Sequence, residues 1–232
     1  PPTNTTTSPG PQLNERLTSP TYIDGMRVTD SHTLSVARSV FNETNDFLCS
    51  SIPNSVGLNS GIFKSTLLDY STWKHVGEVQ TVSVSSMSSV LSQGSVPIVT
   101  CMGETLDGSE YLNINADVAA VQMSRHLSDV GKLIFVSAAG GLKDEDGMII
   151  DSIDLSSEYD RYMGMDWVKY GTRMKLKQFH RLLQDTTVLN EIFVTNPGGI
   201  VQSVMSTMED TSDSDEDYVL KWKDSPLSLI HI

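Results

Sequence analysis

The sequence is short of cysteine, of positive charge and of long apolar segments, and each shortage excludes a class of protein. The two cysteines, Cys49 and Cys101, lie far apart in apolar surroundings, which favours buried thiols in a reducing compartment over a disulfide framework. Sixteen Lys and Arg against 29 Asp and Glu give a net charge of −13, so no concentrated positive surface for a nucleic acid is expected. No apolar run approaches the ~18 residues of a transmembrane helix, so no membrane partner is expected.

Several catalytic motifs are also missing. The five histidines lie apart from carboxylate or cysteine partners at ligand spacing, so no protein-held metal is expected. The serine-rich run 81–92 contains no nucleophile elbow. The chain has neither the Walker lysine nor the G-x-G-x-x-G spacing. Its chemistry must therefore rest on other groups.

Both ends of the chain differ in composition from the middle. Residues 1–9 are rich in Pro and Thr without an apolar period, which predicts a disordered or non-native leader. Residues 208–226 predict an acidic disordered tail, because six closely spaced acids there repel one another: Glu209, Asp210, Asp213, Asp215, Glu216 and Asp217. The last residues, 227–232, resemble a translated sequencing adapter, an artefact of assembly, with a genuine apolar terminus as the alternative.

Apolar periodicity predicts three helices in the middle of the chain. The first follows the N-cap candidates Thr29 and Asp30 and should cover a sheet with the apolar face Leu34, Ala37, Val40, Phe41, Phe47 and Leu48. The second, 117–127, presents Ala119, Ala120, Met123 and Leu127. The third, 174–183, presents Met174, Phe179, Leu182 and Leu183.

Short apolar runs between these helices predict buried strands at 96–102, 132–137 and 192–195. Strands that alternate with helices predict an α/β fold, a three-layer α/β/α sandwich around a mostly parallel sheet. Ligands bind such sheets beyond the carboxyl ends of the strands, so the loops after Thr100, Ser137 and Thr195 are the places to look for a site.

Two segments at such places could bind a ligand or be purely structural. The loop Ser137–Gly141 could bring backbone N–H groups to a phosphate, but a tight turn after a strand explains it equally simply. Asn113, Asn115 and Asp117 precede the second helix. Capping would account for one of these polar residues, and three of them suggest a further role.

Cations surround the start of the third helix: Lys169, Arg173, Lys175 and Lys177. A solvated helix face is the simplest explanation. A cation at a helix N-terminus opposes the helix dipole, so an anionic ligand would relieve the conflict. By itself, Arg27 is uninformative.

Four runs together carry a specific resemblance: GPQLNERL at 10–17, YIDGMRVTDSHTLSVARSVFNE at 22–43, LNINADVAA at 112–120 and DLSSEYDRYMGMDWVKYGTRMKLK at 154–177. Over 10–195 the chain resembles the acetylglutamate kinases of the amino-acid kinase family. It is most similar to the fungal mitochondrial type that is made with N-acetyl-gamma-glutamyl-phosphate reductase.

The resemblance implies phosphorylation of the side-chain carboxylate of N-acetyl-L-glutamate by ATP in arginine biosynthesis, with Mg²⁺ held by the phosphates. It assigns catalytic roles to Lys175 and Asp117. It assigns substrate binding to Gly10, Arg27 and Asn113. Nucleotide binding falls to Ser137, Ala138, Gly140, Gly141 and Lys169. An ionised carboxylate needs no base, so cations and N–H donors supply most of such catalysis.

The resemblance also implies a domain organisation. A kinase domain is expected over 10–207, with an acetylglutamate-binding part at 10–112 and a nucleotide-binding part at 113–207. The first lysine is Lys64, whereas the family carries a phosphate-binding lysine on its first strand. We therefore expect that strand to be missing and the fragment to have impaired activity.

The relatives further imply a mitochondrial matrix location, L-arginine as a feedback inhibitor, a homo-oligomer and association with other arginine-pathway enzymes. The alternative is the kinase-like, arginine-binding regulatory domain of an N-acetylglutamate synthase. Lys175, Asp117 and Asn113 favour the active kinase. A non-enzymatic assembly module is a third interpretation, supported only by the acidic tail.

Overall fold

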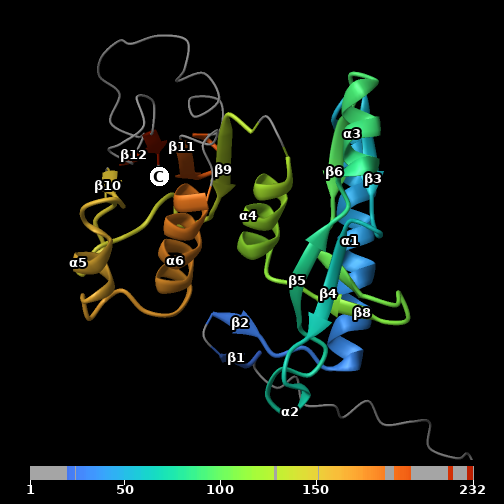
Figure 1. Cartoon of the computed structure of the whole chain (residues 1–232), viewed down its shortest axis with the longest axis horizontal. Coiled ribbons are helices and arrows are strands. Elements are labelled where there is room, and N and C mark those ends of the chain that lie inside the picture. The colour runs from blue at the N-terminus through green and yellow to red at the C-terminus, as the bar shows by residue number, and fades with distance from the viewer. Residues whose placement is uncertain are drawn as a thin grey trace, which may run out of the picture.

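The computed structural model describes residues 20–23, 25–127, 130–150, 152–185 and 191–199, with two short strands at 219–221 and 229–231. Two groups of strands and helices lie on either side of a central helix, α4 (Figure 1). The N-terminal group extends to β8, and the C-terminal group begins at β9.

A parallel strand pair, covered by a long helix, forms one part of the N-terminal group. Strands β3 (Ser55–Leu58) and β6 (Val96–Val99) pair in parallel, and helix α1 (Ser31–Ser51) contacts both. Asp30 caps α1 by accepting a hydrogen bond from the Thr33 N–H at 2.7 Å, which confirms the predicted start. The short helix α3 (Val84–Ser92) also contacts β6.

The predicted apolar face of α1 was partly wrong. Val40 is 49% and Phe47 is 68% exposed, so both point away from the sheet. The one buried residue of α1 is Asn45, whose Nδ2 donates to the carbonyl of Ile98 on β6 at 2.8 Å. Because the buried residue is polar, the pattern of apolar residues does not indicate which face of α1 packs on the sheet.

A four-stranded sheet completes the N-terminal group, in the order β5-β4-β7-β8. Its strands are β4 (Phe63–Leu67), β5 (Gly77–Val82), β7 (Met102–Thr105) and β8 (Tyr111–Asn113). Only β4 and β7 pair in parallel, and the one-turn helix α2 (Tyr70–Trp73) connects β4 to β5. The prediction of one strand over 96–102 was wrong. Strand β6 ends before Thr100, and after Cys101 the chain enters β7, which belongs to a different sheet.

The C-terminal group is built on the parallel pair β9 (Lys132–Val136) and β11 (Glu191–Thr195), at the positions of two predicted strands. Helix α6 (Tyr170–Asp185) packs against the short helix α5 (Tyr159–Met163). The ring of Phe179 on α6 lies 4.9 Å from the ring of Phe135 on β9, measured between centroids.

A three-stranded sheet completes the C-terminal group. Strand β10 (Ser152–Asp154) pairs in parallel with β12 (Val219–Lys221), which pairs antiparallel with β13 (Leu229–His231). No structure was expected in the segments that contain β12 and β13. The predicted acidic tail contains β12, and the predicted adapter artefact contains β13. The domain boundaries themselves stay predictions.

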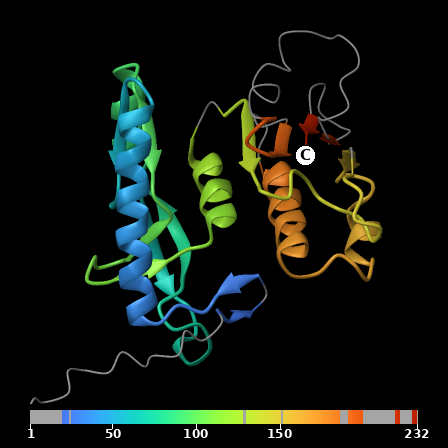
Figure 2. The ribbon, with the colours of Figure 1, turned by 180° about the vertical axis from the view of Figure 1, so that it is seen from behind.

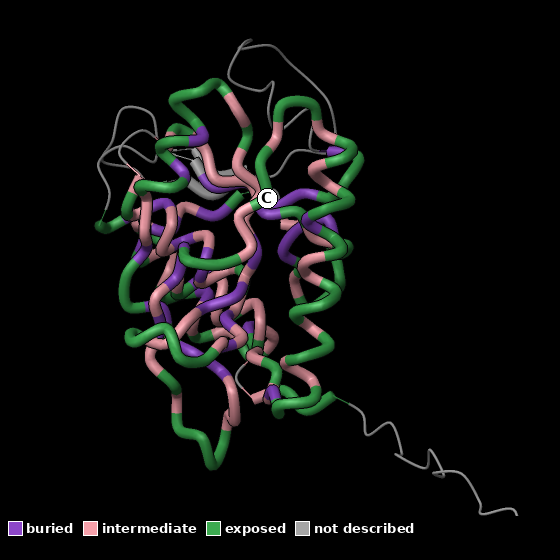
Figure 3. Tube along the Cα trace, turned by 90° about the vertical axis from the view of Figure 1, so that its right-hand side faces the viewer, coloured by how far each residue is buried: buried purple, intermediate pink, exposed green. Residues whose placement is uncertain are grey.

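Helix α4 (Ala116–His126) lies between the two groups and contacts β5, α6 and β9, as Figures 1 and 2 show from opposite sides. Its Ala119 belongs to the N-terminal core and its Val121 to the C-terminal core. The N-terminal core comprises Ile62, Phe63, Val79, Val82, Met87, Ile114 and Ala119. Figure 3 shows buried residues in the interior and exposed residues on the outer turns. The predicted α/β class with parallel strands is confirmed.

Candidate active site

A cavity of about 390 Å³ lies in the N-terminal group. Its walls come from the hairpin of β1 (Tyr22–Ile23) and β2 (Met26–Arg27), α1, β6 and the junction between β8 and α4. Two residues predicted to bind substrate, Arg27 and Asn113, both line it, although they are far apart in the sequence. The fold thus brings an arginine and an asparagine to the wall of one cavity of small-molecule size.

Arg27 ends a hairpin made of β1 (Tyr22–Ile23) and β2 (Met26–Arg27). Gly25 lies at the turn with a φ of +80°, a conformation that L residues rarely adopt. A Cβ at this position would be 3.2 Å from the backbone nitrogen of Gly171. The hairpin therefore approaches the start of α6 and extends from the cavity to the C-terminal half.

Asn113, Asn115 and Asp117, at the start of α4, make three different kinds of contact. Asn113 Nδ2 donates to the hydroxyl of Thr29 at 2.9 Å. Asn115 caps α4, since its Oδ1 accepts from the N–H groups of Asp117 and Val118, so the capping explanation holds for this residue. Asp117 stands in the first turn of α4 and points toward a cation.

That cation is Lys175. Its Nζ on α6 forms an ion pair with Oδ2 of Asp117 on α4, and the side chains are 23% and 17% exposed. Asn115 and Ala116, just before Asp117, line the cavity. The pair therefore lies next to the cavity wall, at the boundary between the two halves.

The neighbouring thiol is not a nucleophile at neutral pH. Cys101 lines the same cavity, and burial raises its pKa to about 11, with a further contribution from the negative charge of Asp117. A thiol with such a pKa is almost fully protonated near neutrality. Cations, carboxylates and amides remain as the active groups of this site.

In the C-terminal group, two loops meet after the parallel strands β9 and β11. The loop Ser137–Gly141 follows β9, and the Ser137 N–H donates to the carbonyl of Thr195 at the end of β11. The N–H groups of Ala139 and Gly140 both donate to Ser137. A phosphate at this loop would compete with those bonds for two donors.

The second loop, residues 196–199, was not among the predicted site residues. Asn196 Oδ1 accepts from the N–H groups of Gly198 and Gly199 at 2.8 and 2.9 Å. A Cβ at Gly140 would be 3.5 Å from Asn196 Nδ2, so the two loops pack together. The run Asn-Pro-Gly-Gly after an apolar strand was the available signal.

The other predicted residues lie apart from this group or outside the described chain. Lys169 is exposed immediately before α6. Gly10 lies outside the described residues. The structure therefore joins Arg27 with Asn113, and Lys175 with Asp117.

A second cleft, of about 420 Å³, lies between the hairpin, β5 and α6. Arg173, Lys177 and Glu78 line it, all of them exposed. Arg173 Nη1 donates to the carbonyl of Met163 at 2.8 Å. These two cations thus belong to a different face of α6 from Lys175.

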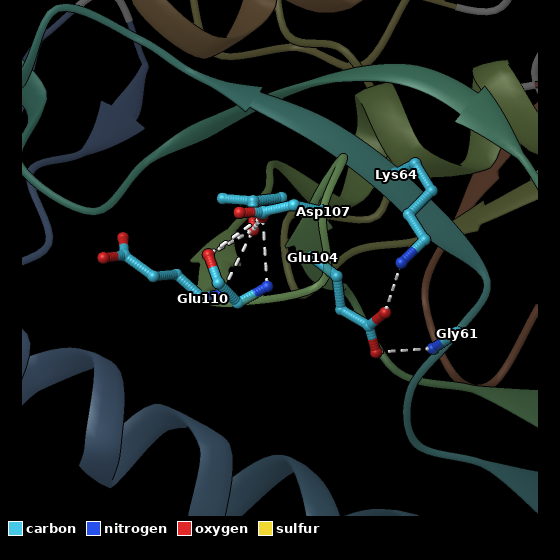
Figure 4. Close-up of polar contacts among 7 residues, drawn as sticks. Gly61, Lys64, Glu104, Asp107 and Glu110 are labelled. Atoms are coloured by element: carbon cyan, nitrogen blue, oxygen red, sulfur yellow. Dashed lines mark hydrogen bonds and ion pairs between the residues drawn. The ribbon is translucent and has the colours of Figure 1, made fainter.

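A separate polar group lies at the β7–β8 hairpin. Glu104 accepts from Lys64 Nζ at 2.8 Å and from the Gly61 N–H at 2.9 Å (Figure 4). Asp107 receives three hydrogen bonds from Thr105 and Ser109 within the turn. These contacts hold the sheet and its turn together rather than forming a site.

Among the described residues, no group of three or more His, Cys, Asp or Glu side chains is arranged to hold a metal ion. No helix in the described part of the chain is both long and apolar enough to span a membrane.

Known proteins with a similar sequence include fungal and bacterial ones. Protein arg-6, mitochondrial, from Neurospora crassa is 38% identical over 196 residues, which cover 81% of this chain and 22% of that protein. Acetylglutamate kinase from Xanthomonas campestris pv. campestris is 34% identical over 205 residues, or 85% of this chain and 48% of that protein. The chain thus spans half or less of the length of these relatives.

A solved structure shows the same fold. N-acetylglutamate synthase from Neisseria gonorrhoeae, in complex with coenzyme A and N-acetyl-glutamate, gives a TM-score of 0.68 at 15% identity. The match covers 87% of this chain and 48% of that chain, and at this identity it shows the fold alone. A family model described as the amino acid kinase family matches residues 11–196. The resemblance seen in the sequence is thereby confirmed, and the chain belongs to the amino acid kinase family.

Proposed function

We propose that this chain is an acetylglutamate kinase, which transfers the γ-phosphoryl group of ATP to the side-chain carboxylate of N-acetyl-L-glutamate. The ion pair of Lys175 and Asp117, next to the cavity that contains Arg27 and Asn113, carries the proposal. The kinase name of the Xanthomonas relative supports it.

The substrate would bind in the cavity beneath the hairpin. The Arg27 guanidinium can pair with a carboxylate through two parallel N–H donors, which fixes the acid in position. Asn113 offers an amide whose Nδ2 is already held by Thr29. A third binding role, for Gly10, stays a prediction from the resemblance.

The reaction joins two anions, so the cations do most of the work. The attacking carboxylate is already ionised at neutral pH and needs no base. Lys175, which Asp117 holds between the two halves, would stabilise negative charge on the phosphoryl group in transit. A bond forms between the carboxylate oxygen and the γ-phosphorus of ATP. The bond from that phosphorus to the bridging oxygen breaks, and ADP leaves.

The nucleotide would bind on the C-terminal half. The described residues offer the loop after β9 (Ser137, Ala138, Gly140 and Gly141) and the exposed Lys169. The described acids form no metal cage, which fits a Mg²⁺ that reaches the site on the ATP phosphates. Bound there, Mg²⁺ would neutralise phosphate charge.

The names of the relatives extend the proposal. The Neurospora relative is called mitochondrial, and we assign the same compartment, the matrix, to this chain. Inhibition by L-arginine, self-association and association with other enzymes of arginine synthesis are parts of the same proposal.

The test measures acyl phosphate as its hydroxamate, with N-acetyl-L-glutamate and MgATP. We expect wild-type protein to form hydroxamate at the reduced rate that the sequence predicts, and Lys175→Ala to form it about 10²–10³ times more slowly. Acetylglutamate binding is measured separately by calorimetry. Wild-type protein that neither binds acetylglutamate nor forms hydroxamate would contradict the proposal.

A further inference from the structure

Thr29 occupies a fully buried position between the hairpin and α1, with 0% of its surface exposed. It follows Arg27 by two residues and precedes the Asp30 cap of α1. A hydroxyl that is cut off from water must find partners within the protein. Its partners are two groups of the candidate substrate cavity.

The hydroxyl of Thr29 acts as acceptor and donor at once. Asn113 Nδ2 donates to Thr29 Oγ1 at 2.9 Å. Thr29 Oγ1 donates in turn to the carbonyl of Arg27, also at 2.9 Å. One hydroxyl therefore links the carboxamide of Asn113 to the backbone that carries the Arg27 guanidinium.

The backbone around this hydroxyl is fixed by other contacts. The Thr29 N–H donates to the carbonyl of Trp73, and the Thr29 carbonyl accepts from the N–H of His75 at 2.8 Å. The His75 carbonyl accepts from the N–H of Asn113 at 2.9 Å. Backbone bonds alone thus hold Thr29 and Asn113 side by side, so removal of the hydroxyl should leave the fold intact.

We propose that Thr29 is a positioning residue, whose hydroxyl orients Asn113 and Arg27 toward the acid substrate. This inference rests on the proposed function for the role of those two residues. With Nδ2 held by Thr29, the Asn113 amide cannot rotate end over end, and its Oδ1 stays available to a ligand. An orientation fixed in advance lowers the entropy that binding must remove.

Two substitutions separate the hydroxyl from the shape of the side chain. Thr29→Val keeps the branched shape and removes both hydrogen bonds, whereas Thr29→Ser keeps the hydroxyl. We expect Thr29→Val to weaken acetylglutamate binding about tenfold. Thr29→Ser should bind within about threefold of wild type, and ATP binding should not change in either variant.

Ser124→Ala is the matched control. Ser124 is also buried, and its hydroxyl donates to the Ala120 carbonyl within α4 at 2.9 Å, away from the Arg27 cavity. Its loss should lower thermal stability without changing acetylglutamate affinity. If Thr29→Val lowers only thermal stability, as this control does, the positioning role is overturned.

A measurement without ligand keeps the inference separate from the proposed function. In the ¹H–¹⁵N spectrum of the free protein, the Asn113 side-chain amide should shift in Thr29→Val and stay near its wild-type position in Thr29→Ser. An unchanged Asn113 signal in Thr29→Val overturns the positioning role of Thr29. Failure of the wild-type protein to bind acetylglutamate, with the Asn113 shift present, would instead contradict the proposed function.

Discussion

Lys175 on α6 and Asp117 on α4 form an ion pair that joins the two halves of the molecule. The pair lies where the cavity that contains Arg27 approaches the C-terminal half. A lysine held in this way cannot turn into solvent, so its charge stays at the boundary.

Removal of this lysine should abolish most of the proposed kinase activity. We expect Lys175→Ala to lower kcat for hydroxamate formation by about 10²–10³, the usual effect of losing one group that stabilises a transition state. Lys177→Ala is the control, because Lys177 is exposed on the face of α6 that lines the second cleft. Equal activity of the two variants would exclude the assigned role of Lys175.

Arg27 should control substrate affinity. Arg27→Ala should raise the Kd for acetylglutamate about tenfold or more, since a charge-assisted pair with the carboxylate is lost. ATP affinity should not change. Arg38→Ala provides the control, because the Arg38 guanidinium stacks at 3.8 Å on the Tyr111 ring and does not line the Arg27 cavity. A similar loss of affinity in both variants would indicate a general charge effect.

The turn of the hairpin should be sensitive to a single methyl group. Gly25→Ala places a Cβ 3.2 Å from the Gly171 nitrogen at a φ of +80°. Gly147 has a φ of +78° and open space around it, so Gly147→Ala should cost about 1–2 kcal/mol of stability from backbone strain alone. Gly25→Ala should cost more and should also weaken acetylglutamate binding. Equal costs in thermal denaturation would show that the contact with Gly171 is unimportant.

Cys101 should resist alkylation. A pKa of about 11, against a usual value of 9.0, leaves about a hundredfold less thiolate at pH 8. Mass spectrometry after iodoacetamide treatment should find Cys101 modified only once the protein is unfolded. Rapid modification of Cys101 in folded protein would show that the cavity wall is open at this residue.

Glu104 should contribute stability that acid removes. The hydrogen bond from Lys64, aided by the Gly61 N–H, lowers the pKa of Glu104 below its usual 4.5. Its ionised form therefore stabilises the fold fully above pH 4.5, and this contribution is lost as the pH falls through the lower, folded-state pKa.

The corresponding variant is Glu104→Gln. Its free energy of unfolding at pH 7 should be about 0.5–1 kcal/mol lower than that of the wild type. The difference from wild type should vanish in acid. Glu110→Gln, on the same hairpin but exposed (Figure 4), is the charge-matched control. A deficit for Glu104→Gln that stays constant down to pH 2 would rule out this ion pair as its cause.

Periodic and local features were predictable from the sequence. The Asp30 cap and the start of α1 follow from side-chain chemistry that acts over three residues. Strands β9 and β11 are continuous apolar runs, and their positions were predicted. The catalytic roles of Lys175 and Asp117 came from the resemblance, and their pairing is seen only in the structure, because no local pattern relates residues on different helices.

Other features depend on tertiary contacts and could not be predicted. The apolar run 96–102 shows no sign of its break, because β6 and β7 differ in their partners rather than in their composition. Thr29 is a cap candidate in the sequence, and only the fold shows it between Arg27 and Asn113. Val40 and Phe47 match the period of a buried face and are nonetheless exposed.

Helix α4 buries Ala119 in one core and Val121 in the other. A rotation of one half against the other would therefore have to pivot on this helix or disrupt the packing of one core. Asp117 stands in its first turn, close to the pivot, where an opening motion displaces atoms least. An opening motion that kept both cores intact would therefore leave Asp117, the ion-pair partner of Lys175, almost in place.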